Sequence, residues 1–426
     1  MRLKMVSMPY LPEEILFNIF SRLPAKSVGK CRCLSKQWLD LLSTKQFIKS
    51  HLARANQENL ILTTTKYTIR SVDTIKGYDR GTVSRDLKLL AVPGHWVEVL
   101  GSCDGLLLLK SNAGKLFMVN PITLEQAKIP KSPLAFNYHE GETIYGFGYD
   151  RVRDDYNVVT ARFYYKLNEM DVLETLIDMY VYSAKRGFWE KIKNLSYDCM
   201  YPVFPCRAGA YVNEAYHWLG ARRRDLDCNV IMVFDFAKEV FSEISPPSGV
   251  DIKDQLSFTL GVLGGCLCVI GDVNNSQGMD VWIMKEYGVA DSWFKLSVDG
   301  YHLGDLFKPL CFVEEGEVVL VVKGPRLVVY NVKERTSRDL LVDGIPGKFV
   351  DGCTFIESLV LPPVTLCCHR EEPASDKDKS ENCWVTYPFG YVSGSAADFT
   401  DTYAYFMKTG FFGKAHYSYG NHMSWL

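Results

Sequence analysis

The sequence predicts an α+β multidomain fold, in which a small N-terminal α-helical domain precedes an all-β propeller. Three observations support this prediction. Large apolar residues recur at helical spacing between positions 11 and 23. From Asn59 to about Pro363, short runs of Val, Ile, Leu and Tyr alternate with turns of Gly, Asn, Asp and Pro. A strand that ends in a polar turn recurs about every 50 residues, close to the length of one propeller blade.

The helical domain is expected to span residues 9–55, after a flexible N-terminus at residues 1–8. Its first helix starts at Pro12, which suits the first helical turn, and stops before Pro24. Three shorter helices are predicted at residues 25–34, from Ser35 onward and at residues 47–52. The first helix presents an apolar stripe of Leu11, Ile15, Leu16, Ile19, Phe20 and Leu23.

This stripe is too large for the small helical domain to bury within itself. A domain of this size has little interior, and apolar side chains left outside it mark a protein interface. The alternative is that the stripe packs wholly against the propeller. Trp38 is assigned mainly to the core of the domain, because a single aromatic residue on a helix usually packs there.

The propeller is expected to span residues 56–363. Each repeat has an apolar hairpin before the polar turn and an outer strand after it, which makes the four strands of one blade. We therefore predict six blades, or seven if the longer step between Val119 and Tyr182 hides one. Residues 60–63 and 353–361 are expected to pair and close the ring. The repeat is marked by Val72-Asp73, Val119-Asn120, Tyr182-Ser183, Phe234-Asp235, Trp282 and Tyr330-Asn331.

Residues 364–426 break this pattern and receive no fold assignment. Their first part, CCHREEPASDKDKSENC, is polar and charged and is predicted to be disordered or a surface loop.

Composition argues against several classes of protein, namely nucleic-acid-binding, secreted and membrane-spanning proteins. The formal net charge of −2 gives no electrostatic reason to expect nucleic-acid binding. The first residues lack the apolar stretch of a secretory signal, and no apolar run is long enough for a membrane helix. The cysteines number 13, an odd count without CxxC pairs, so we expect a reduced compartment, the cytoplasm or the nucleus.

No catalytic motif, cofactor site or metal site is predicted. The sequence lacks HExxH, GxSxG, a Walker loop and a GxGxxG that opens a helix. His217 is expected to lie in a strand rather than to act in catalysis, and Gly264-Gly265 to form a tight turn. Cys266 and Cys268 are expected to be buried thiols. A zinc site is disfavoured by the spacing of its candidate ligands, Cys367, Cys368, His369 and Cys383.

The N-terminal stretch LPEEILFNIFSRLPAKSVGKCRCLSKQWLDLLSTKQFIKSHL resembles the F-box along its whole length. Gly29 is the one departure, since the family more often has a larger residue there. Residues 100–362 resemble the F-box-associated, kelch-like propeller domain of plant F-box proteins. The matching stretches are GSCDGLLLL, NPITLEQAKIP, YGFGYDRVRDDYNVV, VNEAYHWLG, LGVLGGCLCVIGD and DVWIMKEYGVADSWFKL.

The resemblance implies a non-catalytic substrate receptor of an SCF (cullin-RING) ubiquitin ligase. In such a receptor the F-box binds an SKP-type adaptor, and through it the cullin, while the propeller holds a target protein for ubiquitination and degradation. The family also includes members that act in plant defence and in pollen recognition. The resemblance further places His217 in a blade core. The adaptor-binding residues implied are Leu11, Pro12, Ile15, Leu16, Ile19, Phe20, Leu23, Pro24, Val28, Lys36 and Trp38.

Target contacts are expected in loops on one rim of the propeller. Two candidate loops are residues 165–178 and residues 221–229, which include Arg222, Arg223 and Arg224. These arginines either contact an acidic surface of the target or form a solvated hairpin tip. A second hypothesis is that the propeller binds a glycan or a small molecule, which would need an aromatic and polar pocket at the channel mouth.

Overall fold

The computed structural model divides into two compact units, Met1–Arg370 and Glu371–Leu426. Cys367, Cys368, His369 and Cys383, at which a zinc site was disfavoured, lie outside the described residues, as do residues 1–8 and most of the tail. The second unit contributes one hairpin, β27 (Val385–Tyr387) with β28 (Gly390–Val392). The structure describes residues 11–55, 58–65, 68–72, 82–87, 89, 97–111, 114–134, 142–167, 173–192, 200–202, 209–222, 225–248, 258–271, 278–301, 308–313, 316–322, 326–345, 348–363, 385–387 and 390–392.

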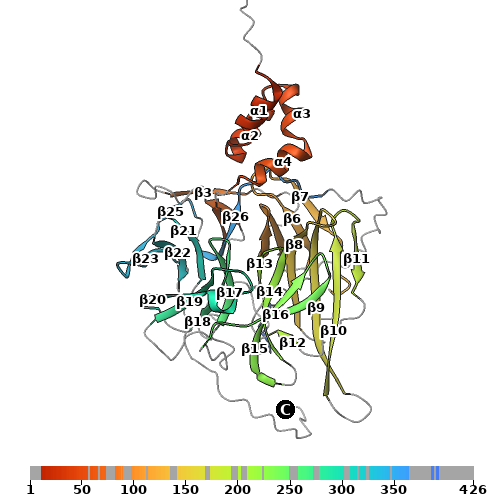
Figure 1. The fold of residues 1–426 in the computed structure, drawn as a ribbon, viewed down its shortest axis with the longest axis vertical. Coiled ribbons are helices and arrows are strands. Elements are labelled where there is room, and N and C mark those ends of the chain that lie inside the picture. Colours follow the sequence, from red (N-terminus) through yellow and green to blue (C-terminus); the bar gives the residue numbers. More distant parts are fainter. Residues whose placement is uncertain are drawn as a thin grey trace, which may run out of the picture. The chain divides into compact units, whose positions relative to one another are not determined.

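Four short helices form the N-terminal domain, as predicted (Figure 1). Two of them start at a side-chain cap. The hydroxyl of Ser35 accepts a hydrogen bond from the Trp38 N–H at 3.1 Å, and the hydroxyl of Thr44 accepts one from the Phe47 N–H at 3.2 Å. Such caps satisfy N–H groups that the first helical turn leaves unpaired. The helices are α1 (Glu13–Phe20), α2 (Ala25–Arg32), α3 (Lys36–Leu42) and α4 (Lys45–Leu52).

Six sheets follow and form a six-bladed propeller, which confirms the smaller of the two predicted blade numbers (Figure 1). Blade 1 contains β26 (Phe349–Ile356), β1 (Glu58–Thr64), β2 (Ile69–Val72), β3 (Thr82–Asp86) and β25 (Val342–Asp343). Blade 2 contains β4 (Val97–Cys103), β5 (Leu106–Ser111), β6 (Leu116–Val119) and β7 (Gln126–Ile129). Blade 3 contains β8 (Glu142–Asp150), β9 (Asp155–Leu167), β10 (Leu173–Ser183) and β11 (Phe188–Lys191).

The second half of the ring has the same order of strands. Blade 4 contains β12 (Met200–Pro202), β13 (Ala210–Val212), β14 (Ala215–Arg222), β15 (Asp225–Asp235) and β16 (Val240–Ile244). Blade 5 contains β17 (Phe258–Leu263), β18 (Cys266–Gly271), β19 (Gly278–Met284) and β20 (Trp293–Asp299), with the short helix η3 (Ala290–Ser292) before β20. Blade 6 contains β21 (Lys308–Phe312), β22 (Glu317–Val322), β23 (Arg326–Asn331) and β24 (Thr336–Asp339).

Each sequence repeat marks the third strand of a blade, counted from the inside. In three of the repeats the polar residue at the end of that strand builds the next turn. The Asn120 Oδ1 accepts hydrogen bonds from the N–H groups of Ile122 and Thr123 at 2.7 and 3.2 Å. Asp235 and Asn331 make the same pair of bonds to the residues two and three positions on. An Asn or Asp side chain stabilises a tight turn in this way, which explains why the pattern recurs.

The ring closes by pairing its first strand with its last. Strands β1 and β26 are antiparallel, with Ile61 opposite Cys353 and Leu62 opposite Gly352. This confirms the predicted seam, except that the last strand ends at Ile356 and residues 357–361 leave the sheet. Blade 1 thus takes its inner strand from the end of the domain and its other main strands from the beginning.

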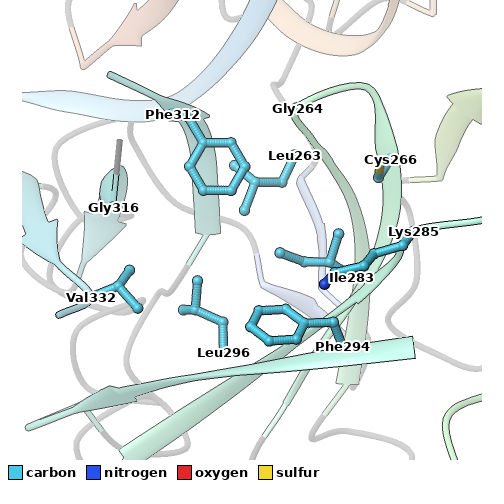
Figure 2. Close-up of a pocket in the computed structure, with 10 residues that line it drawn as sticks. All are labelled: Leu263, Gly264, Cys266, Ile283, Lys285, Phe294, Leu296, Phe312, Gly316 and Val332. Atoms are coloured by element: carbon cyan, nitrogen blue, oxygen red, sulfur yellow. The ribbon is translucent and has the colours of Figure 1, made fainter. Parts of the chain in front are cut away.

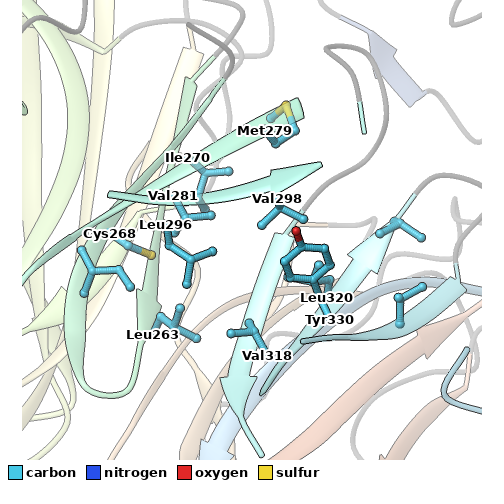
Figure 3. Packing of buried hydrophobic residues seen from close by; sticks show 13 residues of the cluster. Leu263, Cys268, Ile270, Met279, Val281, Leu296, Val298, Val318, Leu320 and Tyr330 are labelled. Carbon is cyan, nitrogen blue, oxygen red and sulfur yellow. The ribbon is translucent and has the colours of Figure 1, made fainter. Parts of the chain in front are cut away.

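Apolar clusters fill the space between consecutive blades. Figure 3 shows the cluster between blades 5 and 6, where Val281 and Leu296 meet Val318 and Leu320. The alternate residues of β22, Val319 among them, pack on the other side against blade 1. Since both faces of such a strand are buried, its sequence is continuously apolar rather than alternating.

The two segments that were expected to be target-binding loops are mostly strands, which corrects that prediction. In residues 165–178, Tyr165 pairs with Thr175 in the long β9–β10 hairpin. In residues 221–229, Ala221 pairs with Asn229 in the β14–β15 hairpin. Longer runs of backbone pairing account for the longer sequence step, so no seventh blade is needed.

His217 lies in a blade core, as predicted. It is fully buried in β14, with its Nδ1 2.9 Å from the Ala210 carbonyl oxygen and its Nε2 2.8 Å from the Tyr287 hydroxyl. Burial lowers the pKa of the His217 imidazole to about 4, because a charged ring is poorly solvated there. The neutral ring joins blade 4 to blade 5.

This burial predicts an acid-sensitive fold. The unfolded chain takes up the His217 proton near pH 6.5, whereas the folded chain does so only near pH 4. The free energy of unfolding should therefore fall as the pH is lowered from about 6.5 to about 4. The contribution lost is about 3 kcal/mol. Urea unfolding at several pH values should show a smaller pH dependence in His217→Gln. In Tyr287→Phe the ring stays buried, so the pH dependence should persist; an unchanged slope in His217→Gln would contradict the assignment.

The seam predicts a specific cross-link. Residues directly opposite in antiparallel strands lie at a distance that a disulfide can span. Mild oxidation of Ile61→Cys should therefore join residue 61 to Cys353, found by peptide mapping without reductant. In the control Leu62→Cys the thiol lies on the other face of the strand and should not reach Cys353. Equal cross-linking of both variants to Cys353 would show a different register.

Candidate functional site

The apolar residues of α1 and its flanks form two rows with different surroundings. Leu16, Phe20 and Leu23 face inward and pack with α2, α3 and α4. Leu11, Ile15 and Ile19, spaced four residues apart, lie 49%, 45% and 46% exposed. Ile15 and Ile19 share one side of α1, and Leu11 lies just before its N-cap, Pro12. These three residues are called the outer row below.

Other exposed residues of the helical domain accompany the outer row. Leu34 and Leu39 are exposed apolar residues of the α2–α3 region, which the sequence reasoning did not single out. Three residues that were implied as adaptor-binding are exposed as well, namely Pro12, Pro24 and Lys36. Exposed leucines beyond the stripe are visible only once the helices are packed.

Two of the residues implied as adaptor-binding lie inside the domain. Val28 is fully buried and Phe20 is 6% exposed. Trp38 is half-buried and packs edge-on against Phe20 at 4.9 Å between ring centroids. These three side chains therefore hold the helices together and set the position of the outer row.

Helix α4 joins the helical domain to the propeller. Its Ile48 and Leu52 pack against the apolar cluster between blades 2 and 3. Leu359, from the segment that follows the closing strand, is buried in the core of the helical domain. The next residue, Val360, is buried in the cluster between blades 2 and 3. One short segment therefore contributes to both cores.

Polar contacts hold this segment in place. The Asn120 Nδ2 donates hydrogen bonds to the carbonyl oxygens of Ser358 and Val360, at 3.1 and 2.7 Å. The Glu357 carboxylate accepts a hydrogen bond from the Asn59 Nδ2 at 2.8 Å and lies 3.7 Å from the Lys26 ammonium. Buried hydrogen bonds of this kind specify one arrangement, since breaking them leaves polar groups without partners.

Asp154 forms a second attachment point. It lies in the β8–β9 turn, and its carboxylate binds Lys45 and Lys49 of α4, the Tyr149 hydroxyl, and Lys185 at 3.3 Å. Its partial burial would raise the pKa of the Asp154 carboxyl, but the hydrogen bonds from the lysines and Tyr149 outweigh this and lower it well below its usual range. The carboxylate therefore stays charged at neutral pH. No sequence pattern pointed to this role of Asp154.

The arginines proposed to contact a target are described only in part. Arg222 ends β14 and pairs with Asp225 across the hairpin, and nothing is described of its side chain. Arg223 and Arg224 lie outside the described residues. Their role in target binding stays a prediction.

Within the described residues, no group of three or more His, Cys, Asp or Glu side chains could hold a metal ion. No helix in that part of the chain is long and apolar enough to cross a membrane. Gly264 and Gly265 have positive φ angles of 59° and 75° and form the tight β17–β18 turn, as predicted. Cys268 is a buried thiol, as predicted, and burial raises its pKa to about 12. The prediction was wrong for Cys266, which is only half-buried at the start of β18.

A six-bladed propeller with a helical domain of exposed apolar residues fixed to one face defines a class of binding scaffold. Comparison with known protein families shows to which family this chain belongs. Residues 8–50 match the F-box domain, and residues 62–361 match the F-box associated beta propeller domain. The F-box protein CPR1 of Arabidopsis thaliana is 30% identical over 83% of this chain and 89% of that protein. An F-box/kelch-repeat protein of the same plant is 29% identical over 84% and 98%.

This chain therefore belongs to the F-box proteins that carry an F-box associated β-propeller. The resemblance stated from the sequence is confirmed. An F-box implies binding to an SKP-type adaptor and, through it, to a cullin.

The junction predicts that charge reversal at Asp154 loosens helix α4. In Asp154→Lys, the new ammonium group faces Lys45, Lys49 and Lys185. We expect the free energy that holds α4 on the propeller to fall by about 1–2 kcal/mol, since exposed ion pairs are individually weak. Hydrogen exchange of the α4 amides should accelerate while that of β22 stays unchanged.

Two further variants make this test specific. Asp178→Lys removes a comparable pair with Lys191 at 2.6 Å on an outer strand of blade 3 and should leave α4 unchanged. Reversing Lys45 and Lys49 to Glu in the Asp154→Lys background should restore slow exchange. Equal acceleration in Asp178→Lys would show that the effect is not specific to the junction.

Proposed function

We propose that this protein is the non-catalytic substrate-recognition subunit of an SCF ubiquitin ligase. The observation that supports this most directly is the outer row of α1. Leu11, Ile15 and Ile19 expose apolar area on the F-box while the inner row already fills its core. A small, exposed apolar strip on a rigid helix is the type of surface that an adaptor subunit buries as a hot spot.

In this proposal the protein acts by proximity. The F-box attaches the chain to the ligase, and the propeller holds the target so that its lysines meet the ubiquitin-loaded enzyme at high effective concentration. The attachments at Asp154, Glu357 and Leu359 support the role, because a firmly held propeller presents its target at a defined distance. No residue of this chain touches the bond being formed.

We further propose that the target is a protein degraded after ubiquitination, and that the chain works in the cytoplasm or the nucleus. A role in plant defence stays a prediction from the family. Glycan binding at the channel mouth stays a prediction. The cavity between blades 5 and 6 does not support it, because its lining is apolar apart from one lysine and contains no Asp or Asn.

The proposal predicts that the strip can be removed without unfolding the protein. Replacing Leu11, Pro12 and Ile15 together with Ala removes exposed apolar area, each side chain contributing roughly 1 kcal/mol or more to adaptor binding. Adaptor affinity should fall at least about a hundredfold in a binding assay with the purified SKP-type adaptor. The melting transition of the propeller should stay the same.

The matched control replaces exposed apolar residues of the propeller, Leu341 and Val240, with Ala and should leave adaptor binding intact. In cells the triple variant should lengthen the half-life of the target that it still captures. A variant that loses the adaptor yet still shortens the half-life of the target would refute the receptor model.

A further inference from the structure

An open apolar groove lies between blades 5 and 6. Its cavity has a volume of about 330 Å³ and is walled by Leu263, Ile283 and Leu296 of blade 5 and by Phe312 and Val332 of blade 6 (Figure 2). Ile283 and Leu296 belong to the inter-blade core beneath it. A cavity of this size accommodates one or two side chains.

The groove opens on the face of the propeller that carries the helical domain. Gly264 lies in the turn between the first two strands of blade 5, and Gly316 precedes the second strand of blade 6. Asp154, which binds α4, lies in the equivalent turn of blade 3. Because equivalent turns of a propeller lie on one face, the groove and the helical domain share that face. They lie apart on it, since the contacts with the F-box come from blades 1 to 3.

Glycines and exposed phenylalanines shape the groove. A Cβ atom on Gly264 would lie 3.1 Å from the Phe312 ring, so the lack of a side chain there lets this ring pack close to the β17–β18 turn. Phe294 and Phe312 are 46% and 44% exposed. Leaving two aromatic side chains half in water is unfavourable unless a partner covers them.

One cation lies among these apolar groups. The Lys285 ammonium is 4.3 Å from the centroid of the Phe294 ring, and Figure 2 shows it reaching toward the centre of the lining (Figure 2). Lys285 makes no ion pair with any described residue. An ammonium group beside an apolar surface favours a ligand that brings a carboxylate next to its apolar part.

We propose that this groove binds a short segment of the target protein that has a large apolar side chain next to an Asp or Glu. The apolar side chain enters between Phe294 and Phe312, and the carboxylate pairs with Lys285. This proposal rests on the proposed receptor function and assigns it a contact surface on blades 5 and 6.

The test uses the full-length protein and short fluorescent peptides that contain Phe-Asp, Phe-Lys or Ala-Asp in the same Gly/Ser surroundings. Fluorescence polarisation should show binding of the Phe-Asp peptide at least about tenfold tighter than that of either other peptide. Lys285→Glu should reverse the preference between Phe-Asp and Phe-Lys. Phe294→Ala and Phe312→Ala should each weaken Phe-Asp binding about tenfold.

A second exposed phenylalanine ring with a cation above it provides the matched control. Phe188 on the outer strand of blade 3 is 48% exposed and lies 4.9 Å from the Arg186 guanidinium. Phe188→Ala and Arg186→Glu should leave peptide binding unchanged. Equal binding of all three peptides, or an equal effect of the control variants, would overturn the proposal.

Two outcomes separate this proposal from others. If Lys285→Glu abolishes self-association on a sizing column and the peptides do not bind, a second copy of the chain occupies the groove and the proposal is wrong. Adaptor binding is measured in parallel. Adaptor affinity should be the same in Lys285→Glu and in the wild type. If the wild type does not bind the adaptor at all, the receptor function is refuted independently of the peptide result.

Discussion

The pairing of β1 with β26 is the constraint on which the rest of the structure depends. Each of the other blades is built from consecutive strands, whereas blade 1 needs strands from both ends of the domain. Without this pairing, two sheet edges and two apolar inter-blade faces would be exposed to water. The six apolar clusters therefore form a closed circuit, and each stabilises the next only when the ring is complete.

The same closure positions the F-box. The chain leaves β26 at Ile356 and places Leu359 in the core of the helical domain and Val360 between blades 2 and 3. Folding of the propeller and docking of the helices are thus coupled through a few consecutive residues. Lys45 and Lys49 of α4 add an electrostatic attachment to Asp154 of blade 3. Attachments on two sides resist rotation better than one, which suits a protein that must present a partner in a fixed direction.

The two rows of α1 show how one helix serves two purposes. A surface helix usually buries one apolar face and covers the other with polar groups. Here Leu16 and Phe20 supply the buried face, while Ile15 and Ile19 widen the apolar arc beyond what the domain can cover. The groove between blades 5 and 6 is the corresponding feature of the propeller, because the rings of Phe294 and Phe312 are only about half buried there. Both surfaces suit the binding of a partner.

Two expectations came from the fold class and the family rather than from a local pattern: the seam partners and the burial of His217. The sequence by itself determined the local features, the four helices and the third strand of each blade. Periodicity and turn chemistry act between near neighbours, so a single sequence displays them. Only the tertiary structure decided which apolar residues of α1 face outward and that residues 165–178 extend a hairpin. It also brought Lys45 to Asp154, 109 positions away, and assembled the groove from two blades. Such contacts depend on how distant segments pack, and no local pattern encodes them.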